Sequence, residues 1–492
     1  MSEGRGYHPA MVETGPRAVP PESTDVQDVA PSRSPASRVG TALARNWLFT
    51  TLLAAGAALR LAAMLAYRPV LPLGRDAQQY VARAVTSQAG DSFHPFLYSL
   101  LLKPFIALGH LALAPLAQHL AALGMAVLLY ALLRRLSVGP AVATIAAVPL
   151  LLDGYQLNIE HQVQSETFFQ LFLVGACVLI AWWDRPHPLA VAGAGVLAAA
   201  ASLVRFPGLA LIVALIAYVA IRRMGWVRLG ALVAGAAVAL GVYSVWFRSQ
   251  SGSVGLTNRN GFYLYGRVVS FADCIQVSVP EELQVFCPDP NRPPPAKAGL
   301  FTSGLPDVIR QDPAYNGPAL RFSLIMIRAK PVSYAEAVFR DFLKYFGIAR
   351  PDTREPNASH WAFQRTVTRT AQDVSGIQLR FHVRPGLAAF LTEYQRFAWT
   401  YGPALAALLL LGVAGGILGF RRRGEERPLG PECWLFTLSA VGVLLFPPVF
   451  DVYHIRYVLP ALPLAAPAGA LGLAAILRRR SAGREPAPTA AG

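Results

Sequence analysis

The chain has 492 residues, of which 54% are hydrophobic and only 15% are charged. A soluble globular protein usually carries about 25% charged residues, so this composition argues against a soluble enzyme. The formal net charge is +16, but the Arg residues lie in short runs between apolar segments. That pattern argues against a nucleic-acid-binding protein and is typical of the cytoplasmic loops of a polytopic membrane protein.

The first 45 residues bury little, because they are rich in Pro, Ser, Thr and acidic residues. We expect residues 1–45 to form a disordered cytoplasmic tail. The first strongly apolar run starts near Trp47 and continues as a membrane span, so it does not resemble a cleaved signal peptide.

Ten apolar stretches approach the roughly 20 residues that a transmembrane helix needs. If the N-terminus is cytoplasmic, these spans place every Arg run between them on the cytoplasmic side, as the positive-inside rule requires. The shorter stretches leave a count of nine or eleven open. The sequence therefore predicts an all-α polytopic membrane protein with about ten transmembrane helices, at 46–67, 115–133, 139–153, 164–183, 188–204, 206–221, 227–247, 399–420, 432–450 and 456–477.

The first outer loop, residues 68–114, contains one more apolar segment at 94–112. If this segment crossed the membrane, every later Arg run would fall outside. We therefore expect a re-entrant or interfacial helix on the outer face, in which Lys103 reaches water and Pro104 bends the chain.

The domain organisation follows from these spans. Residues 46–247 form an N-terminal transmembrane module, 399–477 form C-terminal transmembrane helices, and 478–492 form a second cytoplasmic tail. Between the two modules, 248–398 is too polar to span and is predicted to be a small α+β or irregular extracytoplasmic domain. Within it, Ser333 and Glu336 form a Ser-x-x-Glu capping box that predicts a helix from Pro331 towards Gly347, lying on the membrane surface or against the domain core.

Two of the four cysteines, Cys274 and Cys287, fall in this outer segment. An extracytoplasmic compartment is oxidising, so a local disulfide between them is expected. Cys177 and Cys433 lie inside spans, where a free Cys usually packs as a small apolar residue. No metal-type Cys and His spacing accompanies Cys274 and Cys287.

Ionisable residues gather at the predicted outer ends of the spans, where they are functional hypotheses by default. The set comprises Arg75 and Asp76 after the first span, His94 in the interfacial segment, Glu160, His161 and Glu166 in the next outer loop, Arg205 at another span end, and Arg456 with Tyr457 in the last outer turn. This set suits transfer of a group from a lipid-linked anionic donor. A carboxylate can take the proton of an attacking hydroxyl, and cations can stabilise a phosphate leaving group.

Structural interpretations of the same residues remain open. Asp76 and Gln79 also form an Asp-x-x-Gln cap for a helix over 77–86. Glu166 follows Ser165 at the start of a span, where an acid stabilises the helix N-terminus. Glu160 has no such local explanation, and Arg60 in the first span either reaches the outer interface or contacts phosphate.

In its short motifs, the sequence resembles the GT-C superfamily of integral-membrane glycosyltransferases. These motifs are Arg75-Asp76-x-x-x-Tyr80, the Pro-Phe-Leu-Tyr segment at 95–98, Glu160-His161 followed by Ser165-Glu166, Leu203-Val-Arg205-x-Pro207, and Arg456-Tyr457-x-x-Pro460. The similarity is strongest to transferases that use a polyprenyl-phosphate sugar, which include the protein O-mannosyltransferases and the lipid A aminoarabinose transferase. It covers about 46–247 and 399–477, and it rests on the order of the motifs.

The resemblance implies an active site on the outer face of the plasma membrane and a polyprenyl-phosphate sugar as donor. By position, Asp76 is the base, and Glu160 or Glu166 is a second acid. Many relatives have a Lys before a Pro-Pro pair in the interfacial segment, where this chain has His94 and Pro95-Phe96. The phosphate ligand therefore stays open among His94, Lys103, Arg205 and Arg456. Some members of the superfamily need a divalent metal and others do not.

The leading hypothesis is thus a glycosyltransferase that acts in the lipid bilayer on a lipid-linked donor and an acceptor hydroxyl of protein, lipid or polysaccharide. A transporter or flippase of lipid-linked sugars would also need charge within the membrane. Transporters usually show internal repeats and sites near the midplane, whereas here no repeat is apparent and the polar residues lie at the outer edge. A non-catalytic assembly subunit is the third hypothesis, and retained function after Asp76→Asn would favour it.

Overall fold

The computed structural model describes residues 46–89, 93–289, 304–348, 350, 361–367, 370–420 and 427–482. The predicted tail 1–45 and residues 483–492 lie outside these ranges. The chain divides into two compact units, 1–47 and 48–492, and all the elements below belong to the second unit apart from the first residue of the first helix.

The N-terminal module is a succession of apolar helices that begin and end close to the predicted positions. They are α2 (Trp47–Ala66), α5 (Leu113–Arg135), α6 (Pro140–Leu152), α7 (Gly154–His161), α8 (Glu166–Ala181), α9 (Pro188–Val204), α10 (Gly208–Ile221) and α11 (Trp226–Ser251). The C-terminal module contains α16 (Pro385–Phe397), α17 (Gly402–Leu418), α18 (Gly430–Phe450) and α19 (Val458–Ala482). Helix α19 continues through Arg478–Arg480, where a cytoplasmic tail was predicted.

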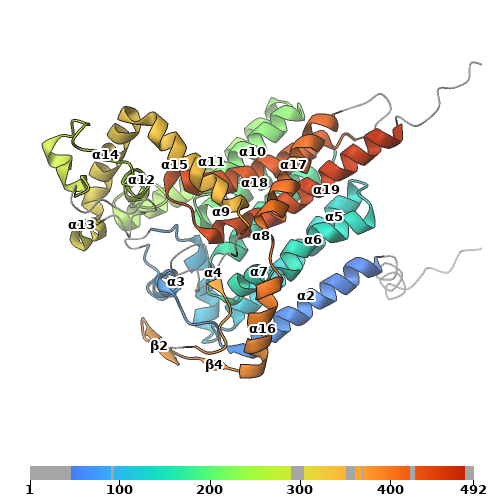
Figure 1. The fold of residues 1–492 in the computed structure, drawn as a ribbon, viewed down its shortest axis with the longest axis horizontal. Coiled ribbons are helices and arrows are strands. Elements are labelled where there is room, and N and C mark those ends of the chain that lie inside the picture. Colours follow the sequence, from blue (N-terminus) through green and yellow to red (C-terminus); the bar gives the residue numbers. More distant parts are fainter. Residues whose placement is uncertain are drawn as a thin grey trace, which may run out of the picture. The chain divides into compact units, whose positions relative to one another are not determined.

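The two modules form one apolar core. Helix α19 packs against α17 and α18 of its own module and against α6 and α8 of the N-terminal one. Figure 1 shows α5, α6 and α19 running in nearly the same direction, one beside the next. Fully buried Leu462, Leu464 and Leu471 place α19 at the centre of this core.

Several helices have the length and composition of membrane spans, as in a multi-pass membrane protein. Five qualify outright: α2, α5, α11, α18 and the segment Ile455–Arg480. The count rises to seven if two bent pairs, α6 with α7 and α16 with α17, are each one span. Helices α8, α9 and α10 lie at predicted spans but have only 16, 17 and 14 residues. The predicted count of about ten is therefore not confirmed by length, although a helix lies at each predicted position.

The region predicted to be the first outer loop contains β1 (Tyr67–Arg68), α3 (Arg75–Thr86) and α4 (Leu97–Ala107). With 11 residues and Pro104 inside it, α4 is about 16 Å long and too short to cross a bilayer. The helix predicted over 77–86 exists, but it begins two residues earlier. Its N-cap position is Gly74, so the prediction that Asp76 caps the helix is wrong. Asp76 instead lies within the first turn, where its carboxylate is free to bond elsewhere.

The segment 248–398, predicted to be extracytoplasmic, is mostly helical. It comprises α12 (Asn260–Val268), η1 (Glu281–Phe286), α13 (Asp307–Gln311), η3 (Pro313–Tyr315), α14 (Asn316–Ala329), α15 (Pro331–Leu343), η4 (Lys344–Phe346), β2 (Ala371–Val374), β3 (Ile377–Arg380) and β4 (His382–Val383). Its first part has a core of its own, in which Phe262, Phe286 and Phe322 are fully buried. The segment nevertheless belongs to the same compact unit as the apolar helices.

Helix α15 starts at Pro331 and leads through η4 to Gly347, as predicted, but the capping box does not form. Ser333 lies inside the helix, and the N-cap residue is Lys330, which makes no side-chain cap bond. Phe339 is 61% exposed, while Tyr345 and Asp341 are buried. One face of α15 therefore packs inwards and the other is open.

Two short sheets attach the end of this segment to the first outer loop. Strand β1 pairs with β4, Tyr67 with Val383. Strands β2 and β3 form a hairpin whose turn residues, Ser375 and Gly376, both have positive φ, a backbone geometry that matches the strand twist. The hairpin residue Gln372 accepts a hydrogen bond from Leu73 N at 2.8 Å and donates to Leu73 O at 3.1 Å. These bonds fix the backbone three residues before Asp76.

A disulfide joins Cys274, which follows α12, to Cys287, which directly follows η1, with 5.9 Å between the Cα atoms. Cys177 and Cys433 are free and buried within the apolar core.

Candidate functional site

Asp76 is the centre of a polar cluster at the start of α3. Its Oδ2 accepts a hydrogen bond from Arg456 Nη1 at 2.6 Å, and its Oδ1 lies 3.5 Å from His94 Nε2. The Asp76 side chain is 24% exposed, whereas Arg456 and His94 are 10% and 13% exposed. The carboxylate is thus reachable from solvent and is held by groups that are less exposed.

A second ion pair adjoins the first. Arg205 Nη1 donates to Glu166 Oε1 at 2.7 Å and to Ser165 Oγ at 3.0 Å. Arg456 Nε lies 3.8 Å from the same Glu166 oxygen. Glu166 therefore lies between the two arginines, and the two ion pairs form one continuous cluster.

Short connections between apolar helices determine where these side chains lie. Arg205 ends α9 in an extended conformation, and Gly208 begins α10 three residues later. A Cβ on Gly208 would lie 2.3 Å from Ser202 N, so only glycine allows this close reversal. Glu166 is the first residue of α8, as the sequence predicted, and the positive end of that helix also favours its charge.

Aromatic rings line the cluster. The Arg205 guanidinium lies 5.1 Å from the Tyr457 ring, and that of Arg456 lies 5.3 Å from the Trp361 ring. Tyr80 donates to or accepts from Ser165 Oγ at 3.2 Å, and its ring lies 5.4 Å from that of His94. These rings exclude water on one side and strengthen the charge interactions.

The electrostatics keep Asp76 ionised. Burial raises the pKa of this carboxyl, but the charge of Arg456 and the interaction with His94 outweigh burial and hold the pKa well below its usual range. Burial lowers the pKa of His94, with the charges of Arg205 and Arg456 acting in the same direction. Burial and Arg456 lower the pKa of His454 to about 3. The two histidines are therefore neutral near pH 7, and the positive charge comes from the arginines.

Both arginines keep a donor available. Within the ranges that the structure describes, Arg205 and Arg456 make their hydrogen bonds through Nη1 alone, which leaves each Nη2 without a hydrogen bond. Glu166 Oε2 is buried and also has no hydrogen-bond partner among the described residues. Two guanidinium groups with unused donors, side by side, suit an anion with several oxygens.

Glu160 and His161 lie in a different cluster, inside the apolar core. Glu160 is fully buried, and its Oε1 accepts from Arg60 Nη2 at 2.7 Å. Its Oε2 lies 2.9 Å from His119 Nδ1, and His119 Nε2 lies 3.1 Å from His161 Nδ1. Arg60 also donates to the backbone of Leu150 and Leu151. Arg60 therefore bonds inwards, and neither it nor Glu160 contacts the Asp76 cluster.

The remaining predicted site residues lie on exposed surfaces. Arg75 is exposed at the start of α3, and Lys103 is exposed on α4. Among the described residues, Lys103 makes no hydrogen bond or ion pair with Asp76, His94 or the two arginines. Of the four predicted phosphate ligands, the structure brings His94, Arg205 and Arg456 to one place and leaves Lys103 apart.

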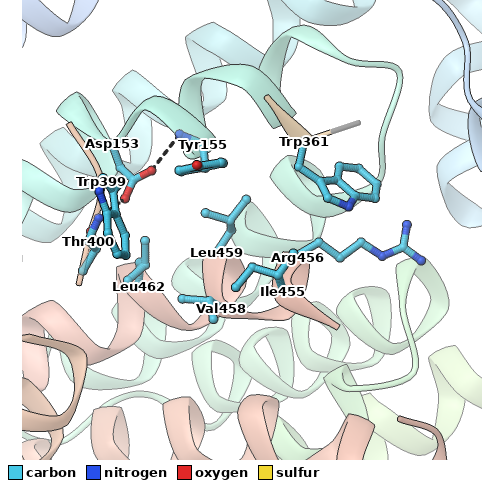
Figure 2. A pocket seen from close by; sticks show the side chains of 10 residues that line it. All are labelled: Asp153, Tyr155, Trp361, Trp399, Thr400, Ile455, Arg456, Val458, Leu459 and Leu462. Carbon is cyan, nitrogen blue, oxygen red and sulfur yellow. Dashed lines mark hydrogen bonds between the residues drawn. The ribbon is translucent and has the colours of Figure 1, made fainter. Parts of the chain in front are cut away.

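A pocket of about 350 Å³, including the open space at its mouth, adjoins Arg456. Figure 2 shows Trp361 and Arg456 at one end, Asp153, Trp399 and Thr400 at the other, and apolar side chains of α19 along the floor. Both Asp153 oxygens already accept backbone bonds, from Tyr155 N, Gln156 N and Thr400 N. The pocket is therefore mainly apolar, with one cation at its end.

No group of three His, Cys, Asp or Glu side chains with metal-binding geometry occurs in the part of the chain that the structure describes. The cluster around Asp76 contains two carboxylates, but each is paired with an arginine.

Some residues of the two polar clusters are not among the predicted site residues. Gln118 and His119 are polar residues inside an apolar helix, a signal that marks them as candidates, and Gln118 accepts from Tyr98 OH at 2.8 Å. Trp361 carries no such signal, because a single aromatic residue in a polar segment has many structural roles. Its place beside Arg456 depends on the path of the whole outer segment.

No protein-family model matches the chain, and no curated protein matches it in sequence. Among solved structures, the chain is similar to the crystal structure of the Archaeoglobus fulgidus oligosaccharyltransferase tethered to an acceptor peptide with the NVT sequon, at a TM-score of 0.39 and 12% identity. The match covers 90% of this chain and 51% of that one, so this chain spans about half its length.

Proposed function

We propose that the protein is a glycosyltransferase that moves a sugar from a polyprenyl-phosphate donor to an acceptor hydroxyl, on the extracytoplasmic face of the plasma membrane. One observation carries the proposal. An ionised and accessible carboxylate, Asp76, accepts a hydrogen bond from Arg456, which shares Glu166 with Arg205. Among the described residues, neither arginine makes a hydrogen bond through Nη2. The order of motifs that resembles the GT-C superfamily supports the same class.

The chemistry divides between these residues. Asp76 accepts the proton of the acceptor hydroxyl while the hydroxyl oxygen attacks the anomeric carbon of the donor sugar. The bond from that carbon to the phosphate oxygen breaks, and the polyprenyl phosphate leaves with an added negative charge. Arg205 and Arg456 stabilise this charge through their Nη2 donors. Glu166 orients both guanidinium groups, and His94 orients the Asp76 carboxylate.

The pocket beside Arg456 supports a lipid-linked donor. Its lining of Trp, Tyr, Ile, Val and Leu side chains has few unused polar atoms, so it suits an isoprenoid chain better than a sugar. A phosphate bound at Arg456 would have the apolar start of its lipid within this pocket.

A transporter of lipid-linked sugars is the second candidate, and one observation favours it. The buried Arg60–Glu160–His119 cluster puts charge deep among apolar helices, where transporters often have their sites. However, this cluster is closed, because both Glu160 oxygens accept bonds and Arg60 is only 3% exposed. We therefore assign it to holding α2 against α6 and α7.

The test is sugar transfer by purified protein in detergent. The assay uses a panel of radiolabelled polyprenyl-phosphate hexoses and pentoses as donors and a membrane extract as acceptor. Transfer of one labelled sugar to the extract supports the proposal and identifies the donor. If no donor is consumed, while proteoliposomes containing the protein move a labelled donor between leaflets, the transporter is the better description.

A further inference from the structure

The turn at residues 451–457 carries Arg456 between α18 and α19. Apart from the single turn η7 (Ile455–Tyr457), it has no regular structure. It follows Pro447 and Pro448, which break the backbone bonding at the end of α18. Contacts with other parts of the protein must therefore fix where this turn presents the Arg456 guanidinium.

Asp341 of α15 makes the most direct of these contacts. Its Oδ2 accepts a hydrogen bond from Tyr453 N at 3.1 Å, three residues before Arg456. The same oxygen accepts from Arg267 Nη1 of α12 at 2.5 Å, and Oδ1 accepts from Lys344 Nζ. Asp341 and Arg267 are 3% and 1% exposed.

Other contacts from the same helix and the η4 turn after it reinforce this attachment. Tyr334 OH donates to Val449 O at 2.9 Å, just before the turn. The ring of Tyr345 packs against that of Tyr453, with 4.8 Å between the centroids. Residues 334–345 therefore hold the turn at a backbone carbonyl before it, at a backbone N–H within it and at an aromatic ring.

We infer that Asp341 is a positioning residue for the proposed transfer reaction, because it holds the turn that presents Arg456 to Asp76. The inference rests on the proposed function, and it makes the outer segment 248–398 part of the catalytic apparatus. A movement of α15 relative to α18 would move Tyr453 and, with it, Arg456.

A buried Asp at position 341 suits a geometric role. A buried ion pair loses much of its Coulombic gain to desolvation, so the pair of Asp341 and Arg267 need not make the fold more stable. A carboxylate that accepts from a backbone N–H and from a guanidinium fixes two partners in one geometry, which an apolar contact does not. Proper placement matters because a shift of about 1 Å in a catalytic group can cost about 100-fold in rate.

The inference predicts a change in pH dependence. Asp76 faces His94 and Arg456 directly, with Arg205, Glu166, Tyr80, Tyr263 and His454 nearby. Of these groups, Arg456 and His454 lie on the turn, and His454 is neutral. If the turn moves, Asp76 loses mainly the charge of Arg456, and its carboxyl becomes harder to ionise because His94 then opposes the effect of burial without that charge.

The experiment measures kcat, KM for the donor, and the pH profile of kcat for Asp341→Asn and Asp341→Glu, with the donor found in the panel. Asp273→Asn is the matched control, since Asp273 pairs with Lys330 in the same segment and, among the described residues, makes no hydrogen bond or ion pair with the turn. Asp341→Asn is expected to lower kcat about 10- to 100-fold with a smaller change in KM, and to move the acid limb of the profile to higher pH. The control should keep both values of the wild-type protein.

If Asp341→Asn does not fold, Asp341→Glu tests the positioning role, because it keeps the charge but displaces the carboxylate by one methylene. A lower kcat and a shifted acid limb in folded Asp341→Glu support the inference. Wild-type kcat and an unshifted limb in a folded variant overturn it.

Asp76→Asn is measured in parallel. If that variant keeps full transfer, the proposed function of Asp76 fails. If Asp76→Asn is inactive while folded Asp341 variants are unaffected, only the positioning role fails.

Discussion

Arg456 Nη1 donates a hydrogen bond to Asp76 Oδ2 at 2.6 Å, although the two residues are 380 positions apart in the sequence. Asp76 lies on the first helix after the first apolar span, and Arg456 lies just before the last. Their contact closes the polar cluster, because Arg456 also approaches Glu166, which pairs with Arg205. The proposed base and the proposed phosphate ligands thus depend on the docking of α19 against the N-terminal module.

Replacement of Arg456 by Gln tests the link between base and cation. In the wild-type protein, Arg456 holds the pKa of Asp76 well below its usual range. A general base must be deprotonated. Above about pH 4 Asp76 should be fully ionised in the wild-type protein, so its titration should not affect kcat there. Arg456→Gln removes the positive charge that lowers the pKa of Asp76. The acid limb of the kcat profile should therefore move to higher pH by about 1 to 3 units. An unshifted limb would show that Asp76 does not control the profile.

Glu160 and Glu166 are both acids of the predicted second outer loop, and we expect different effects when each is replaced. Glu160→Gln weakens a buried pair with Arg60 and should cost about 3 to 5 kcal/mol of stability. Its transfer rate per folded molecule should stay close to the wild-type rate. Glu166→Gln releases Arg205 beside Asp76, and this rate should fall about 10- to 100-fold. Thermal unfolding in detergent, together with transfer rates normalised to folded protein, separates the two variants. A stable but slow Glu160→Gln and an unstable but active Glu166→Gln would contradict these assignments.

Asp451 should make stability depend on pH. Burial raises the pKa of its carboxyl to about 7, despite the opposing charges of Arg267 and Arg456. The folded protein therefore binds this proton more tightly than the unfolded chain, whose carboxyl titrates near pH 4. The corresponding stability is complete below about pH 4 and is lost as the pH rises through about 7. Asp451→Asn should reduce this dependence, so the gain in Tm over wild type should be larger at pH 8 than at pH 5. An equal difference at both pH values would contradict the assignment.

Cysteine labelling tests the proposed face of the membrane. Lys103→Cys replaces an exposed side chain on the predicted outer face, and Arg185→Cys replaces one in the predicted cytoplasmic loop after α8. Wild-type protein is a suitable background, because Cys177 and Cys433 are buried and the other two cysteines form a disulfide. An impermeant maleimide added to intact cells should label position 103 and reach position 185 only after permeabilisation. Labelling of both positions in intact cells would refute the topology.

The sequence predicts the apolar helices and the outer position of Asp76, Glu166, Arg205 and Arg456 because ionisable residues at the ends of apolar stretches stand out. It does not separate Glu160 from Glu166, only six residues apart. Glu160 lies on α7, which is bent by 49° from α6, and this bend turns its side chain into the core. The direction of a two-turn helix after a bend depends on packing between distant segments. Here Gly154 packs so closely on α16 that a Cβ would lie 2.8 Å from Gln395 Cα.

The contact between Asp341 and Tyr453 is beyond sequence prediction for the same reason. Asp341 resembles any acidic residue on an amphipathic helix, with Lys344 one turn away as an obvious local partner. Its bonds to Arg267 and to the Tyr453 backbone arise only when α12, α15 and the 451–457 turn meet.

The most direct test of the central claim is sugar transfer by purified wild-type protein and Asp76→Asn, with the polyprenyl-phosphate sugar that the wild-type protein consumes. Asp307→Asn, at a carboxylate that is 69% exposed on α13, is the matched control. We predict that Asp76→Asn folds normally and that its transfer rate falls about 100- to 10,000-fold, the usual contribution of a general base, while the control retains the wild-type rate. Transfer at the wild-type rate by folded Asp76→Asn would contradict the account.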